Sequence, residues 1–245
     1  YKILDENSKK NPDRQPRKLE PWGPIHETFG TYEIIHAMHP KFGKMFVGEI
    51  VNGIPRGSIC FGGTAEGRFL ISAFCQSHSE GRPFFTLTQN ALADPLYLTY
   101  VADMYGDKIH VADTNDSQKS IADYMADAKT RILHDQAHPE EPHQLKPGED
   151  AHLDTNGNVQ VSGQIAIMSI NGLMAKAIFE KNPSREFFVE ESFPLDWMFP
   201  HLTPNGPILR INRAEIPELT DAVLKKDHEY WTKSVTPLIG NWITY

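Results

Sequence analysis

The sequence lacks the long apolar run that a membrane-spanning helix requires. Such a helix needs about 18 to 20 consecutive apolar residues, and the most apolar stretch, residues 165–179, is interrupted by a serine, an asparagine, a glycine and a lysine. We therefore expect no transmembrane segment in this chain. The chain begins at Tyr1 and shows no charged segment followed by a short apolar one, so we expect a piece of a longer precursor.

An excess of basic residues is also absent. The 245 residues include 24 lysines and arginines against 32 aspartates and glutamates, which gives a formal net charge of -8. Proteins that bind nucleic acids neutralise phosphates with clustered Lys and Arg, and no basic run here is longer than a pair. We therefore expect no nucleic-acid partner.

Cysteine is scarce, with Cys60 and Cys75 as the two examples, and no CxxC spacing is present. Each lies in an apolar segment, which is typical of a small buried hydrophobic residue. A disulfide between them is the alternative in an oxidising compartment.

The usual signatures of metal, nucleotide and nucleophile sites are missing. Three histidines, His134, His138 and His143, lie near Glu140 and Glu141, but no HExxH or similar ligand spacing occurs. The sequence also contains no GxGxxG, Walker or GxSxG pattern. We expect no metal and no cofactor.

Short β-rich runs alternate with helical patterns along most of the chain. The predicted strands are 58–61, 83–88, 108–112, 186–189 and 207–211, and the predicted helices are 42–54, 68–78, 94–105, 117–134, 163–181 and the tail 214–245. Such alternation predicts βαβ units, whose right-handed crossovers place helices on both faces of a sheet. We therefore expect an α/β fold with a doubly wound, mostly parallel, Rossmann-like sheet of about five strands.

The composition of the first 24 residues differs from that of the rest of the chain. Residues 1–24 are polar and contain several prolines, so they predict a linker or arm, and residues 25–245 predict a single α/β domain. Within the domain, residues 135–161 predict a loop and hairpin excursion. Asp154 to Asn158 is its turn, which is the simplest role for Asp154.

Ligands of open α/β sheets bind beyond the carboxyl ends of the strands, at the point where the connections change direction. This rule places a site between the loop after residue 62 and the strand ends at Thr88 and Val189. The candidate ligand-binding residues are Gly62, Gly63, Thr64, Glu66, Arg68, Gln89 and Asn90. A tight turn that needs glycine backbone freedom is the alternative for the glycines.

Acidic residues also follow predicted strand ends. A pair of carboxylates in a cleft can act as general acid and base, and the candidate catalytic residues are Asp113, Glu190 and Glu191. Neighbours on a strand point to opposite faces, so one of the two glutamates would need a partner such as Asp113, Glu66 or Asp196. Solvated strand-end acids are the alternative.

Two stretches, 54–69 and 186–211, resemble the segments that open and close the soluble region of bacterial multi-pass membrane proteins related to protein O-mannosyltransferases. The resemblance extends over most of residues 40–213. The family's loop after the first strand is commonly rich in Asp and Asn, whereas this chain has Gly-Thr-Ala-Glu-Gly-Arg at 63–68, which puts a role for those acids in doubt here.

The stretch 190–198 resembles mucin-degrading aspartic-type proteases of verrucomicrobial, Akkermansia-like bacteria. This resemblance implies a secreted or periplasmic hydrolase that acts on glycoprotein such as mucin. The Asp-Thr-Gly turns of pepsin are absent, so an aspartic-type protease would use another scaffold. The alternative, favoured by the missing catalytic signature, is a non-catalytic glycan- or protein-binding domain of a membrane glycosyltransferase-like protein.

Overall fold

The computed structural model describes residues 22–37, 40–62, 69, 71, 81–190 and 194–236. The helices are α2 (Trp22–Ala37), α3 (Pro40–Gly53), α5 (Pro95–Tyr105), α6 (Thr114–Ala137), α7 (Gly163–Lys181) and α8 (Asp221–Tyr230). The strands are β1 (Ile59–Gly62), β2 (Phe85–Thr88), β3 (Asp150–Leu153), β4 (Val159–Ser162), β5 (Phe187–Glu190), β6 (Leu202–Asn205) and β7 (Ile208–Ile211). Short helical turns are η1 (Gln89–Ala91), η2 (Gly106–Lys108), η3 (Asp196–His201) and η4 (Trp231–Val235).

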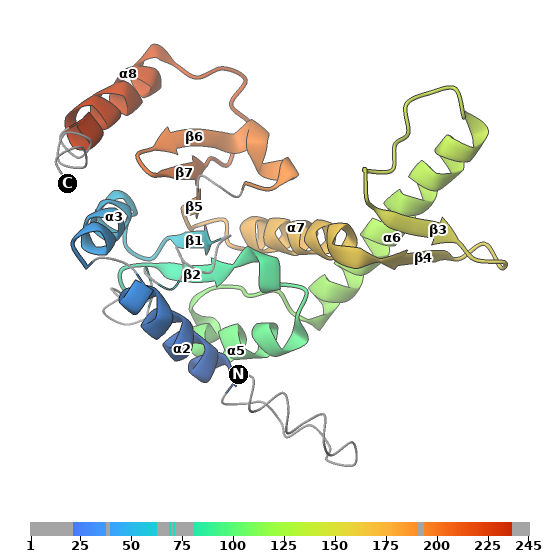
Figure 1. Ribbon diagram of the computed structural model, residues 1–245, viewed down its shortest axis with the longest axis horizontal. Coiled ribbons are helices and arrows are strands. Elements are labelled where there is room, and N and C mark those ends of the chain that lie inside the picture. The colour runs from blue at the N-terminus through green and yellow to red at the C-terminus, as the bar shows by residue number, and fades with distance from the viewer. Residues whose placement is uncertain are drawn as a thin grey trace.

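The main sheet has five strands in the order β2-β1-β5-β7-β6 (Figure 1). β1 pairs in parallel with β2 and with β5, whereas β7 pairs antiparallel with β5 and with β6. The α/β class and the number of strands were predicted correctly. The expectation of a mostly parallel sheet was wrong, since the sheet is mixed.

The antiparallel half follows from a short connection. β6 and β7 form a hairpin whose turn residue Gly206 has a φ of +69°, and hairpins of this length pair antiparallel. Pro204 in β6 is tolerated because β6 is the edge strand. The ring of Tyr230 lies 3.1 Å from the position of a Cβ at Gly206, which places α8 against this turn.

The predicted strand 108–112 was also wrong. Asn182 donates from Nδ2 to the carbonyl of His110 at 2.9 Å and accepts from its N–H at 2.8 Å. One side chain therefore satisfies both backbone groups that a neighbouring strand would pair. Residues 109–113 instead form an extended loop that connects η2 to α6.

Apolar side chains cover both faces of the sheet. On one face, Phe61, Leu87 and Phe187 pack with residues of α5 and α7. On the other face, Cys60 and Phe188 pack with Ile50 of α3. Cys60 is buried, as predicted for a small hydrophobic residue, and Cys75 lies outside the described residues.

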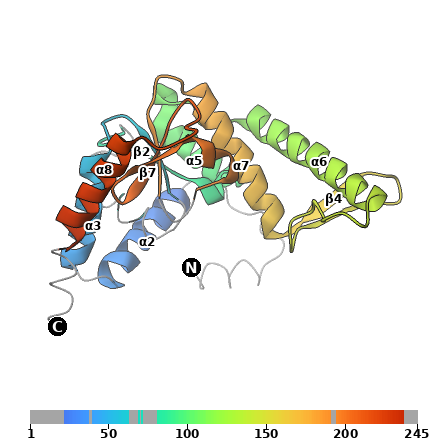
Figure 2. The same ribbon diagram turned by 90° about the horizontal axis from the view of Figure 1, so that it is seen from above.

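The predicted excursion is an arm that extends beyond the sheet. α6, the antiparallel pair β3–β4 and the N-terminal half of α7 lie away from the main sheet in Figures 1 and 2. α6 and the β3–β4 pair share a core of their own, with Ala128, Ile132 and Val159 buried. Asp154 closes the β3–β4 turn, as predicted, by accepting the N–H groups of Asn156 and Asn158 at 2.8 Å each.

The helices over 42–54, 94–105, 117–134 and 163–181 are present as predicted, while 68–78 falls mostly outside the described residues. The tail is helical from residue 221 to residue 236, so the prediction was wrong for residues 214–220, and residues 237–245 lie outside the described residues. In the part of the chain that the structure describes, no helix is both long enough and apolar enough to cross a membrane.

Candidate functional site

The connections of the sheet change direction at β1. The connection from β1 to β2 carries Ile71 to the face that α3 covers, and the connection from β2 to β5 carries α5 and α7 to the opposite face. Ile71, which lies between β1 and β2 in the chain, is therefore on one face of the sheet, and the helices between β2 and β5 are on the other. Ligands of open α/β sheets bind beyond the carboxyl ends of parallel strands, which here are those of β1, β2 and β5.

Four predicted site residues meet at this edge. Gly62 pairs with Thr88 across β1 and β2, and Phe61 pairs with Val189 across β1 and β5, so Glu190 lies level with Gly62. Gln89 and Asn90 follow β2 directly. Gln89 is fully buried and Glu190 is only 6% exposed. The sequence therefore located the polar residues at the carboxyl edge correctly, and their roles stay a prediction.

Asn171 of α7 holds the turn after β2 in place. Its Oδ1 accepts the N–H of Ala93 at 2.5 Å and its Nδ2 donates to the carbonyl of Asn90 at 2.9 Å. Asn171 has no exposed surface. One buried amide therefore fixes the backbone next to Gln89.

The other predicted ligand contacts, Gly63, Thr64, Glu66 and Arg68, lie outside the described residues, as does the catalytic candidate Glu191. Their roles stay predictions.

Asp113 lies at the opposite end of the sheet from Glu190. It precedes α6 and contacts Asp116, which is bound by Lys181 at the end of α7, just before β5 begins. Glu190 is the last residue of β5. The structure therefore separates Asp113 from Glu190 by the length of β5, and the two do not form a carboxylate pair.

Asp113 instead caps α6. Its Oδ1 accepts the N–H of Asp116 at 2.9 Å, and Asp116 Oδ2 accepts the N–H of Asp113 at 3.2 Å, which is a reciprocal capping box. We expect Asp113→Ala to lower the free energy of unfolding by about 1 kcal/mol. Asp113→Ser, which caps but carries no carboxylate, should unfold like the wild type in urea. A Ser variant as unstable as the Ala variant would contradict the capping role.

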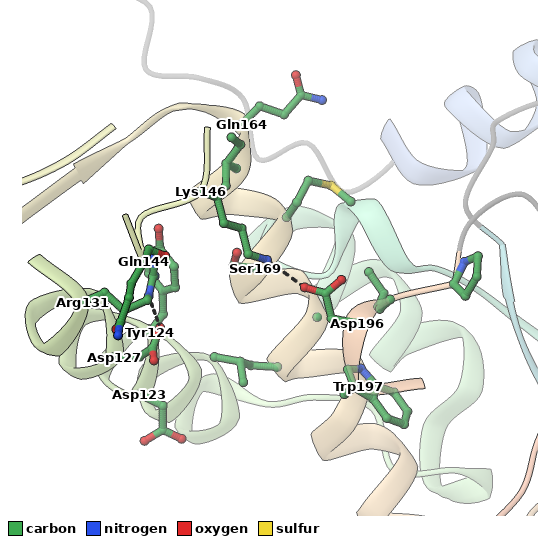
Figure 3. Close-up of a pocket in the computed structure, with 16 residues that line it drawn as sticks. Asp123, Tyr124, Asp127, Arg131, Gln144, Lys146, Gln164, Ser169, Asp196 and Trp197 are labelled. Carbon is green, nitrogen blue, oxygen red and sulfur yellow. Dashed lines mark hydrogen bonds and ion pairs between the residues drawn. The ribbon is translucent and has the colours of Figure 1, made fainter. Parts of the chain in front are cut away.

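A cavity of about 700 Å³ lies beyond the carboxyl edge, in the angle between α6 and α7 (Figure 3). α7 runs antiparallel to β5, and because Asn171 contacts the end of β2, residues 164–170 project past the sheet. The lining of the cavity comes from α6 (Asp123, Tyr124, Asp127, Arg131), from α7 (Gln164, Ile165, Met168, Ser169, Gly172, Leu173), from the loop before β3 (Gln144, Lys146) and from residues 194–197.

The cavity combines an apolar floor with a polar rim. Met168, Leu173 and Trp197 contribute apolar surface, and Asp123, Asp127 and other polar groups surround it. Pockets for small molecules typically have volumes of roughly 300 to 1,000 Å³ and a few oriented polar groups on an apolar lining. The volume of this cavity falls within that range, and its lining is of that kind.

A charged network fixes the α6 wall. Arg131 binds Glu149 with two hydrogen bonds of 2.6 and 2.8 Å and binds Asp127 at 2.8 Å, and Tyr124 donates to Glu149 at 2.6 Å. The Glu149 side chain has no exposed surface. Hydrogen bonds from Arg131 lower the pKa of Glu149 to about 2, and burial followed by the contact with Glu149 raises the pKa of Tyr124 to about 12.

An ion pair spans the cavity between the arm and the sheet domain. Lys146 Nζ lies 2.7 Å from Asp196 Oδ2, and Figure 3 shows the two side chains reaching toward each other from opposite walls. Asp196 is 85% exposed. The pair is therefore open to solvent and to a competing ligand.

A comparison with models of known protein families finds no match, and comparisons with curated proteins and with solved structures find none either. The resemblances noted in the sequence therefore remain expectations, and the function has to be inferred from the geometry of the site.

Sequence reasoning missed the cavity, apart from Asp196. Its walls are parts of α6, α7 and two loops that lie far apart in the sequence. The one local signal was in α7, where Ser169 and Gly172 interrupt an otherwise apolar helix on the side that faces the cavity. Within the described residues, no group of three or more His, Cys, Asp and Glu is arranged to hold a metal ion.

Proposed function

We propose that this chain is a non-catalytic binding domain that takes a glycan in the cavity between α6 and α7. The cavity of about 700 Å³ is the observation that supports the proposal. The partly exposed Trp197 offers aromatic surface to the apolar face of a sugar ring, and carboxylates and amides of the rim offer partners to hydroxyl groups. The resemblance to a soluble region of glycosyltransferase-like membrane proteins suggests a sugar ligand outside the cytoplasm.

The geometry favours binding over the aspartic-type hydrolysis of mucin that the second resemblance implies. Hydrolysis by two carboxylates requires both beside the scissile bond. Asp113 lies at the other end of β5 from Glu190 and caps a helix. The three rim carboxylates, those of Asp123, Asp127 and Asp196, are each bound by a cationic side chain, which suits them to contact a ligand.

Gly172 allows a test that separates binding from folding. A Cβ at Gly172 meets no atom within 4 Å, although the residue lies buried in α7 and lines the cavity. We expect Gly172→Leu to fill the cavity and reduce glycan binding at least roughly tenfold, while the loss of a helical glycine stabilises the fold by about 0.5 to 1 kcal/mol. Titration calorimetry with neutral mucin-type oligosaccharides and urea unfolding measure the two effects.

Gly48→Leu is the matched control, because Gly48 also lies within a helix, in α3, and also has no atom within 4 Å of its Cβ position. It should leave binding unchanged. Wild-type protein that binds none of the oligosaccharides, or a Gly172→Leu variant that binds as well as the wild type, would contradict the proposal. Release of cleaved mucin by the wild type would support the hydrolase instead.

A further inference from the structure

We infer that the glycan taken by the cavity is neutral or positively charged, and that the cavity rejects sulfated and sialylated chains. This inference rests on the proposed function. It comes from how the charged groups of the lining are already paired.

Both cations of the lining are held by carboxylates of the protein. Arg131 uses Nε for Asp127 and both terminal nitrogens for Glu149. Lys146 binds Asp196 at 2.7 Å. An anionic group on a ligand would have to compete with Glu149 and Asp127 for the largely buried Arg131, and displacing Glu149 leaves a buried carboxylate without its cation. At the exposed Lys146 it would have to share the ammonium with Asp196, whose negative charge repels it.

The carboxylates of the rim, by contrast, keep acceptor capacity on their solvent side. Asp123, Asp127 and Asp196 are 51%, 64% and 85% exposed. An ionised carboxylate has about four lone-pair sites, more than are used by the cationic side chain that each rim carboxylate binds. The rim is therefore rich in acceptors, which suits hydroxyl and ammonium donors.

The net charge of the cavity also opposes the binding of anionic ligands. Three aspartates and two cations line the cavity, and two partners stand behind the lining, Glu149 at Arg131 and Lys119 at Asp123. The four carboxylates exceed the three cations, so the site is negative as a whole, in a chain of net charge -8. Like charges across a binding surface oppose association and thereby exclude ligands of the wrong sign.

Three matched disaccharides test the inference: N,N′-diacetylchitobiose, its doubly de-N-acetylated diamine and its O-sulfated form. They share one ring skeleton and differ in charge. We expect the sulfated form to bind roughly tenfold more weakly than the neutral form at low ionic strength, and the diamine to bind at least as well as the neutral form. The difference should shrink at about 0.5 M salt, since the rim carboxylates are exposed to screening ions.

Asp196→Asn leaves Lys146 without its carboxylate, so we expect it to remove most of the discrimination against the sulfated disaccharide. Asp103→Asn on α5 makes the same charge change at an exposed position that does not line the cavity, and should leave the discrimination intact. If all three disaccharides bind the wild type equally, or the sulfated form binds best, the inference is overturned while the proposed function stands. If none of them binds, and neutral mucin-type oligosaccharides do not bind either, the proposed function itself fails.

Discussion

Replacing Arg131 with methionine is expected to lower the free energy of unfolding by about 3 to 5 kcal/mol, the cost of leaving a buried charge without its partner. Arg131 supplies the cation that faces Glu149, whose side chain has no exposed surface. The remaining contacts of Glu149, the hydroxyl of Tyr124 and the N–H of Lys146 at 2.9 Å, are neutral donors. Urea unfolding followed by circular dichroism measures the effect.

A second variant identifies the charge as the cause. In Arg131→Met/Glu149→Gln the buried group is neutral; the glutamine oxygen can accept the N–H of Lys146, and its amide nitrogen can donate to the hydroxyl oxygen of Tyr124. We expect the double variant to recover most of the lost stability. If it is as unstable as Arg131→Met, then lost packing of the arginine explains the effect and the charge argument is wrong.

The ion pair of Arg131 and Glu149 also predicts that the free energy of unfolding depends on pH. The pKa of Glu149 is about 2 in the folded protein, whereas the ordinary pKa of a glutamate is 4.5. A depressed carboxyl pKa stabilises the fold above the unfolded value, and this contribution is lost as the pH falls from about 4.5 toward 2. It amounts to roughly 3 kcal/mol at neutral pH. The wild type should lose this stability in that range, whereas the double variant should show a flatter profile there.

Local patterns were enough to predict most elements of the fold. α7 begins and ends at the predicted residues, because its apolar run is bounded by a hairpin and by Asn182. β1 and β5 each contain three consecutive apolar residues, as strands buried on both faces should, and β2 alternates Phe and Leu with two threonines. The pattern of apolar residues predicts these helices and strands from the local sequence alone, without knowledge of the elements that pack against them.

The errors arose where a distant residue decides the outcome. Residues 108–112 have the composition of a strand, but Asn182, which lies 72 positions from His110 in the chain, occupies the hydrogen bonds that pairing would use. β6 was not among the predicted strands: its Pro204 disfavours a strand interior, although the dipeptide Asn205-Gly206 is a strong hairpin signal. With β6 and β7 joined as a hairpin, the antiparallel half of the sheet follows.

The candidate site, too, was predicted only in part. Gly62, Gln89, Asn90 and Glu190 could be placed at one edge because the carboxyl ends of parallel strands share an edge. The cavity could not be predicted, since it depends on the angle between the axes of α6 and α7. That angle is set by tertiary contacts, with Asp116 bound to Lys181 where the helices meet and β3–β4 packed between their other ends (Figure 2).

Asn171 connects the sheet edge with the cavity, and its replacement by leucine is the second substitution expected to have a large effect. Leucine has a similar size but no polar atoms, so the half-buried N–H of Ala93 and carbonyl of Asn90 would both lose the hydrogen bond to the fully buried side chain of Asn171. Each unsatisfied buried group costs about 1 to 3 kcal/mol, so we expect Asn171→Leu to lower the free energy of unfolding by about 2 to 5 kcal/mol.

The loss should also be local, which distinguishes it from a general loss of packing. With Asn171 replaced, the amide of Ala93 is no longer held, so hydrogen exchange at Ala93 should become faster than at the core amides of β1 and β5. Asn115→Ala, at an exposed position in the first turn of α6, is the control and should change stability by less than about 0.5 kcal/mol. Because Asn171 precedes Gly172 in α7, loosening the turn after β2 should also weaken glycan binding in the cavity. An Ala93 amide that stays as protected as in the wild type would show that Asn171 does not hold this turn.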